Sequence, residues 1–240
     1  IMIFVRWFGL DTVFCVLAVQ LFLQQMMGGI SSYYLLGISM ATSLFYMIDR
    51  LVDARIDAGS QSFRHLLYSR YPWWMMVSCI ILGSMSMYCW LQFNMPIKFR
   101  LLYGGICCVA HLALLYFKWY RCIKPLVVAA VFSWVMVAGL PVISIVIYGF
   151  IFALTLLNLC VHAAIETKLP LLLWVCLFCS MMGVGLVMIA LPYWWLVTVF
   201  ALGPLLYVPL LLYSKRLAYW YEFGELIYAL PFLVACGLMV

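Results

Sequence analysis

The sequence predicts an all-helical, multi-pass membrane protein with about nine transmembrane helices in a single domain, residues 1–240. Of its 240 residues, 70% are hydrophobic and only 8% are charged. The hydrophobic residues form many runs of about the length needed to cross a bilayer core. These runs are continuous rather than alternating, which favours helices over the strands of a membrane barrel. No segment is polar enough to form a separate soluble module.

Hydropathy and the positions of Gly, Pro and charged residues set the expected spans. They cover residues 8–28, 31–48, 73–92, 101–117, 125–139, 142–161, 171–190, 193–213 and 223–240. Every connection between them is short except the one after the second span. That connection lies within the stretch YMIDRLVDARIDAGSQSFRHLLYSRYP, where charged residues gather.

The Lys and Arg residues predict the orientation of these spans. All 13 basic residues except Lys98 and Arg100 fall on one side of the membrane. Because cytoplasmic loops are enriched in Lys and Arg, we expect the N-terminus and the even-numbered connections to lie in the cytoplasm. The formal net charge of +6 then reflects topology and contact with anionic lipid or phosphate, not nucleic-acid binding.

Three aspartates, Asp49, Asp53 and Asp57, follow the second span at intervals of four residues. On a helix that continues out of the span they form one ridge of carboxylates, which repel one another unless a cation intervenes. Their hard oxygen atoms suit Mg²⁺, which binds through one or two carboxylates and the phosphate oxygens of a substrate. The alternative is a structural helix end whose aspartates pair with nearby arginines, namely Arg50, Arg55 and Arg64.

A second polar ridge, Asn158, His162 and Glu166, has the same spacing at the cytoplasmic end of the sixth span. Polar side chains in an apolar run usually face a cavity or a partner helix. The ridge is therefore either part of a site or a structural polar seam between helices. His111, alone on the fourth span, is expected to be a packed or hydrogen-bonded residue and not a ligand.

Basic side chains on the same predicted side could bind a diphosphate, whose charge needs such donors. The fourth connection supplies Lys118, Arg121 and Lys124, and the second supplies Arg64 and His65. Topology alone would also account for these residues.

In combination, these features resemble the UbiA-type intramembrane prenyltransferases. The first motif of that family, N-x-x-x-D-x-x-x-D, is similar to DRLVDARID, with Asp49 in place of the Asn and with Asp53 and Asp57 at the two Asp positions. The stretch LYFKWYRCIKPLVVAAVFSWVMVAGLP resembles the connection from the fourth helix of the family to the fifth. The resemblance implies nine helices around a central cavity, with the Asp-rich motifs on the cytoplasmic side.

The second motif of the family, D-x-x-x-D, is altered in this chain. HAAIE places His162 and Glu166 at its two positions, and Asn158 stands near the position of a family Tyr. His is a poorer ligand than Asp for a hard cation such as Mg²⁺. The following TKLP resembles KTLP of the family and supports the alignment.

The resemblance implies a Mg²⁺-dependent transfer of an isoprenyl group from an isoprenyl diphosphate to a hydrophobic acceptor, aromatic or lipidic, within the membrane lipid. It assigns catalysis to Asp53, Asp57 and Glu166. It assigns binding of the Mg²⁺ ion to Asp49 together with the same three residues. It assigns binding of the diphosphate to Arg64, Lys118, Arg121 and Asn158.

Two other functions compete with this one. A catalytically inactive UbiA-like subunit, structural or lipid-binding, in a larger membrane complex would fit the altered second motif and the short loops. A small transporter is the third possibility, although its polar residues would be expected at the midplane of the membrane, whereas the charges here gather at one face.

Overall fold

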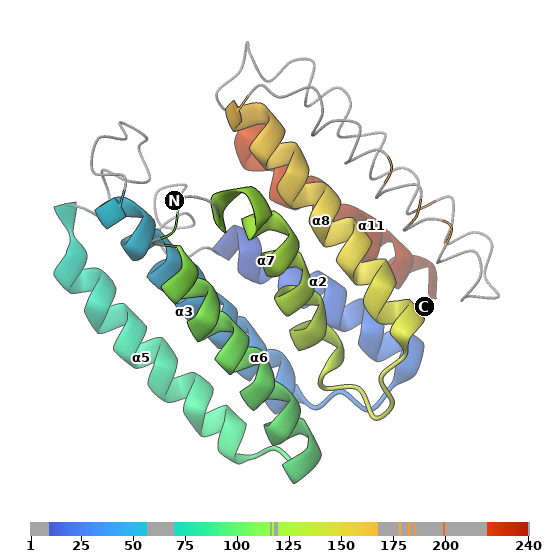
Figure 1. Cartoon of the computed structure of the whole chain (residues 1–240). Coiled ribbons are helices and arrows are strands. Elements are labelled where there is room, and N and C mark those ends of the chain that lie inside the picture. Colours follow the sequence, from blue (N-terminus) through green and yellow to red (C-terminus); the bar gives the residue numbers. More distant parts are fainter. Residues whose placement is uncertain are drawn as a thin grey trace. The chain divides into compact units, whose positions relative to one another are not determined.

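The structure of the chain is a computed structural model. It describes residues 10–56, 70–115, 117, 120–167 and 220–239, with isolated positions 178, 182, 185 and 199. These residues form seven helices and contain no strand (Figure 1). The helices are α2 (Leu10–Met27), α3 (Ser32–Ile56), α5 (Pro72–Leu91), α6 (Met95–Leu114), α7 (Tyr120–Val137), α8 (Ile145–Thr167) and α11 (Trp220–Met239). The all-helical prediction is confirmed for this part of the chain.

Three of the described helices are long and apolar enough to cross a membrane: Ser32–Val52, Pro72–Leu91 and Met95–Leu114. The other apolar helical stretches among the described residues are shorter. The expected spans 171–190 and 193–213 lie outside the described residues, apart from the isolated positions named above. The three helices are compatible with a membrane protein, and the count of nine spans stays a prediction.

Several helices extend beyond the spans expected from hydropathy. Besides α3 and α6, α7 begins at Tyr120 instead of 125, and α8 ends at Thr167 instead of 161. α6 begins at Met95 instead of 101, because the Asn94 side chain accepts a hydrogen bond from the Ile97 N–H at 3.2 Å and caps the helix. α3 continues from 48 to Ile56, so Asp49 and Asp53 lie on one unbroken helix, as expected from their spacing. Hydropathy detects where apolar residues end, whereas backbone hydrogen bonds can continue into polar residues.

The chain divides into two compact units. The first comprises Ile1–Leu17 and Ile30–Lys124, and the second comprises Ala18–Gly29 and Pro125–Val240. The first unit therefore contains α3, α5, α6 and the first turn of α7. The second contains the rest of α7 together with α8, α11 and the later part of α2.

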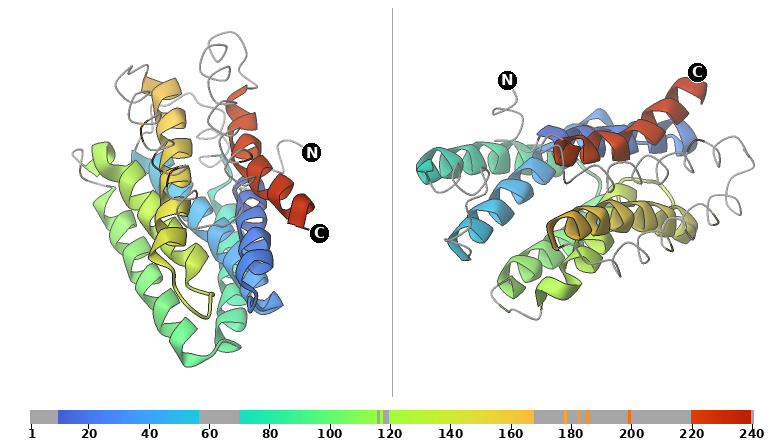
Figure 2. Two further views of the ribbon diagram at one scale, coloured as in Figure 1. Left: turned by 90° about the vertical axis from the view of Figure 1, so that its right-hand side faces the viewer. Right: turned by 90° about the horizontal axis from the view of Figure 1, so that it is seen from above.

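In the first unit, α3 and α5 run side by side (Figures 1 and 2). Met47 of α3 and Met75 of α5 are fully buried at this contact, and Leu51, Cys79 and Leu82 pack around them. Flexible Met side chains fill such irregular space well. This contact fixes the end of α3 that carries Asp49.

A glycine allows α3 and α5 to approach closely. A Cβ atom built on Gly37 would lie 2.8 Å from the Cβ of Cys89, closer than real Cβ atoms come. The Ser86 hydroxyl on α5 donates to the Gly37 carbonyl at 3.3 Å. Small residues with hydrogen bonds across the contact are typical of helix packing in membranes, because lipid gives apolar side chains little reason to associate.

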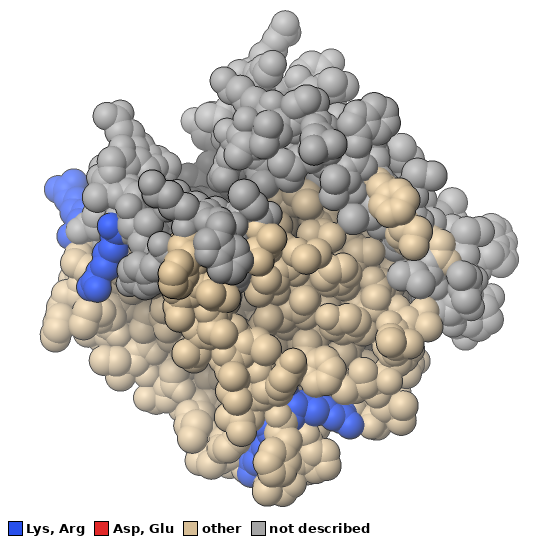
Figure 3. Space-filling view, in the orientation of Figure 1, with Lys and Arg blue, Asp and Glu red and all other residues tan. Residues whose placement is uncertain are grey.

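The outer surface of α5 and α6 is apolar. Of the residues of α5, only Met75 and Cys89 are buried, while Trp73, Ile80 and Tyr88 are exposed. Two exposed serines donate to carbonyls one turn earlier at 2.9 Å, Ser78 to Trp74 and Ser84 to Ile80. The described surface in Figure 3 is nearly all uncharged, with small patches of Lys and Arg. A surface whose polar groups are satisfied internally is suited to contact with hydrocarbon.

In the second unit, α8 packs against α11. Their buried hydroxyls pair, with Thr155 Oγ1 2.9 Å from the hydroxyl oxygen of Tyr228. The fully buried Phe232 of α11 contacts the rings of Phe22 and Phe150 at centroid distances of 5.5 and 6.3 Å. One polar pair thus lies within an aromatic core.

The Thr155–Tyr228 pair gives a first prediction. Replacing Tyr228 with Phe or Thr155 with Val should lower the free energy of unfolding by about 0.5–1.5 kcal/mol each, the range of hydrogen bonds between membrane helices. The double variant should lose less than the two single losses combined, because either change already breaks the bond. Denaturation in mixed detergent micelles measures all three.

Tyr148→Phe is the matched control for this cycle. Its hydroxyl lies 3.4 Å from the Ala130 carbonyl, a longer and weaker contact, so its loss should cost less. Strictly additive losses for the Thr155 and Tyr228 variants would contradict a direct bond between them.

Candidate functional site

A buried carboxylate in the first unit is bound by two basic side chains from other helices. Oδ1 of Asp49 lies 3.3 Å from Nε2 of His111 and 3.2 Å from Nζ of Lys124. Lys124 also reaches Oδ2 of Asp49 at 3.4 Å. We call Asp49, His111 and Lys124 the Asp49 cluster.

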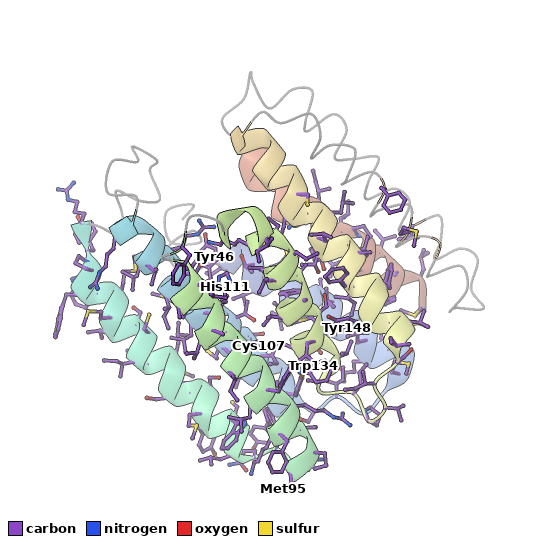
Figure 4. All side chains as sticks on the ribbon, viewed as in Figure 1. Tyr46, Met95, Cys107, His111, Trp134 and Tyr148 are labelled. Carbon is purple, nitrogen blue, oxygen red and sulfur yellow. The ribbon has the colours of Figure 1, made fainter. Side chains whose placement is uncertain are left out.

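The ends of three helices bring the Asp49 cluster together. Asp49 lies in the last turn of the candidate span Ser32–Val52, and His111 lies in the last turn of α6. Lys124 follows a short connection and belongs to the beginning of α7. Figure 4 labels His111 on α6 and, on α3, Tyr46, which precedes Asp49 by three residues. The cluster therefore lies at one end of the candidate spans and not at their middle.

Aromatic rings line the cluster on the α3 side. The ring of Phe45 lies 5.5 Å from the ring of His111, centroid to centroid. The guanidinium of Arg50 lies over the ring of Tyr46 at 5.1 Å, a cation–π contact. The Phe45 ring thus packs against the His111 ring, whose side chain is almost fully buried, and charges in such a place interact more strongly than they would in solvent.

The exposure of the three side chains is unequal. The side chain of His111 is 2% exposed, that of Asp49 is 12% exposed and that of Lys124 is 25% exposed. An isolated carboxylate buried this deeply would be costly, so its two donors are needed. Lys124 is the member that a ligand or solvent can reach most easily.

The Asp49 cluster gives Asp49 partners that the spacing did not predict. Asp49 pairs with Lys124 and His111, residues distant in the sequence. The neighbouring Arg50 also acts electrostatically on this carboxylate, in line with the structural alternative. His111 is buried and hydrogen-bonded, as expected, but the identity of its partner was missed. The available signal was that both polar residues end apolar segments on the same predicted side.

Most other predicted site residues lie outside the described part of the chain. Asp57 and Arg64 fall in the stretch from 57 to 69, and Lys118 is also outside. The backbones of Asp53, Arg121, His162 and Glu166 are helical, but their side chains are outside the described part. Their roles stay predictions.

Asn158 is the described member of the second ridge. It is buried in the second unit, three residues after Thr155 on the same helix. Residues three apart lie near one another on a helix surface, so Asn158 is close to the face that meets Tyr228. This position is compatible with both readings of the ridge, a site or a polar seam between helices.

No group of three or more His, Cys, Asp or Glu side chains that could hold a metal ion occurs among the described residues. The cluster itself has one carboxylate, which offers hard oxygen atoms of the kind that Mg²⁺ binds. Both oxygens already accept bonds from Lys124. Asp49 is therefore less suited to hold a metal ion than an unpaired aspartate would be.

Comparison of the chain with models of protein families, with curated proteins and with solved structures found no match.

Proposed function

We propose that the chain is a multi-pass membrane prenyltransferase of the UbiA type, with its polar end toward the cytoplasm. It would transfer an isoprenyl group from an isoprenyl diphosphate to a hydrophobic acceptor. The observation that best supports this proposal is the course of α3, which continues unbroken through Asp49 and Asp53 and buries Asp49 within the first unit. A charged residue buried near the end of an apolar helix usually has a function.

In this proposal the carboxylates of Asp53, Asp57 and Glu166 would hold Mg²⁺ with the diphosphate. When bound, Mg²⁺ neutralises part of the charge of the diphosphate and makes it a better leaving group. Asp49 would bind the metal more weakly than the other aspartates, because Lys124 and His111 occupy its oxygens.

The basic residues would stabilise the departing diphosphate. Arg64, Lys118 and Arg121, with the amide of Asn158, would donate to its oxygens as the carbon–oxygen bond breaks and the bonding electrons leave with it. The acceptor then attacks the allylic cation and loses a proton. An apolar helical interior would protect that cation from water.

Asp53 provides the test of this function. The purified protein is incubated with Mg²⁺ and labelled isoprenyl diphosphates, and release of diphosphate and formation of prenylated product are measured. Asp53→Ala should lower the rate about 100-fold or more, as expected for loss of a group that stabilises the leaving charge.

Asp11→Ala is the matched control, because Asp11 is an acidic residue of another helix, α2, and has no role in the proposed reaction. It should retain the wild-type rate. If diphosphate binding and release in Asp53→Ala equal those of the wild type, the catalytic proposal is wrong.

The neutralisation of Asp49 within the protein favours a second candidate, the catalytically inactive UbiA-like subunit. A carboxylate paired with this chain's own cations stabilises a helix contact without any ligand. Under this function the wild-type protein would bind no isoprenyl diphosphate, and it would copurify with partner membrane proteins.

A further inference from the structure

Lys124 differs from the basic residues that the family motif assigns to the diphosphate, because its present partner is known. Its ammonium group lies within 3.4 Å of both oxygens of Asp49. It is also the most exposed member of the Asp49 cluster. A lysine ammonium is a compact point charge on a flexible stem, and such groups bind phosphate oxygens well.

We infer that Lys124 binds the diphosphate, and that Asp49 competes with the diphosphate for Lys124 when the site is empty. The inference rests on the proposed function, since it assumes a diphosphate at this end of the first unit. It assigns Asp49 a role other than metal ligation.

Asp49 can release Lys124 because it retains a second donor. His111 lies 3.3 Å from Oδ1, and its side chain is almost fully buried. With Nε2 protonated, His111 keeps donating to the carboxylate after the ammonium has moved away. The carboxylate therefore keeps one hydrogen bond. Breaking a buried ion pair is most costly when the remaining charge has none.

The backbone around Lys124 also permits an adjustment. Lys124 is the last residue of the first unit, and Pro125 follows it inside α7. Proline has no N–H, so one backbone hydrogen bond of a regular helix is missing directly after Lys124. The turn that carries Lys124 is therefore held less tightly than the middle of a regular helix.

The competition predicts the direction in which a change of Asp49 shifts the affinity for a diphosphate. Asp49→Asn removes the competing charge, keeps the shape of the side chain and should increase the affinity for a diphosphate by about tenfold, since it removes a partly buried ion pair that binding must otherwise break. If Asp49 were a metal ligand, the same change should weaken binding. The sign of the effect separates the two roles.

The experiment measures binding of Mg²⁺ with inorganic pyrophosphate to the purified full chain in lipid nanodiscs by calorimetry. We expect tighter binding for Asp49→Asn than for the wild type. In Asp49→Asn/Lys124→Gln this gain should be lost. Equal or weaker binding for a folded Asp49→Asn would overturn the inference, as would a gain that persists without Lys124.

A second variant keeps the test independent of how well Asp49→Asn folds. His111→Phe removes the second donor, so Asp49 should hold Lys124 more strongly and pyrophosphate should bind more weakly. Unchanged or tighter binding in His111→Phe would overturn the competition. Lys98→Met, at the start of α6 with its ammonium over the ring of Trp90, is the matched control and should bind like the wild type.

Asp53→Asn in the same assay separates this inference from the proposed function. If Asp53→Asn loses binding while Asp49→Asn shows no gain, the competition is wrong and the proposed function stands. If Asp53→Asn binds like the wild type while Asp49→Asn gains affinity through Lys124, the competition stands. The assignment of Asp53 to Mg²⁺ binding is then wrong. If no variant binds pyrophosphate, both are wrong.

Discussion

Replacing Lys124 with methionine should lower the free energy of unfolding by about 1–2 kcal/mol. The change keeps most of the apolar stem but removes a cation that neutralises the buried carboxylate of Asp49, while the contact with His111 remains. Removing one partner of a buried ion pair is costly because the remaining charge keeps its desolvation penalty. The expected loss is below that of a fully buried pair, since the Lys124 side chain is 25% exposed. Denaturation in mixed detergent micelles measures it.

A second change should restore much of this stability. In Asp49→Asn/Lys124→Met the unpaired charge is gone, so the double variant should be more stable than Lys124→Met alone. Lys98→Met is the control on α6, and it should cost less than about 1 kcal/mol because its main recorded contact is a cation–π interaction with Trp90. Equal stability of Lys124→Met and the wild type would mean that the pair contributes no net stability.

Replacing Gly37 with valine should lower the free energy of unfolding by about 2–3 kcal/mol. The new Cβ would lie 2.8 Å from the Cβ of Cys89, which is fixed to the backbone of α5 and cannot rotate away. The two helices must therefore separate, which weakens their packing around Met47 and Met75 and the bond from Ser86 to the Gly37 carbonyl. The loss is measured by the same denaturation.

Gly83→Val is the matched control in the same helix pair. A Cβ on Gly83 would lie 3.6 Å from Leu44 Cδ2, an ordinary contact with a flexible side chain, so the helices need not move. Both variants change the helix propensity of a glycine position in the same way. If the two variants lose the same stability, close approach at Gly37 is not the cause.

The sequence predicted the described helices well, because apolar composition and helix length are local properties. Expected ends agreed closely for α2 and α5, where polar or Gly and Pro residues interrupt the apolar run. They were less accurate for α3, α6, α7 and α8. The capping Asn94 sets the start of α6, and the backbone hydrogen bonds of α3 and α8 continue into polar residues. That Asp49 and Asp53 share a helix was also predictable, since spacing alone predicts it.

The partners of Asp49 were not predictable in this way. Lys124 is 75 residues from Asp49 and His111 is 62 residues from it, and no pattern in one sequence joins positions that far apart. His111 was expected to be a packed or hydrogen-bonded residue with no partner named, and Lys124 was expected to reflect topology or to bind a diphosphate. Only the packing of α3 and α6 with the start of α7 made them the donors to one carboxylate.

The sequence by itself therefore determined a helical, membrane-compatible chain with aspartates gathered after one apolar run. The tertiary structure decided that Asp49 is turned inward and neutralised, and that Gly37 meets Cys89 across a close helix contact. The physical reason is that hydrophobicity and helix formation act over neighbouring residues. Neutralising a buried charge and fitting two helix surfaces depend on groups that only folding brings together.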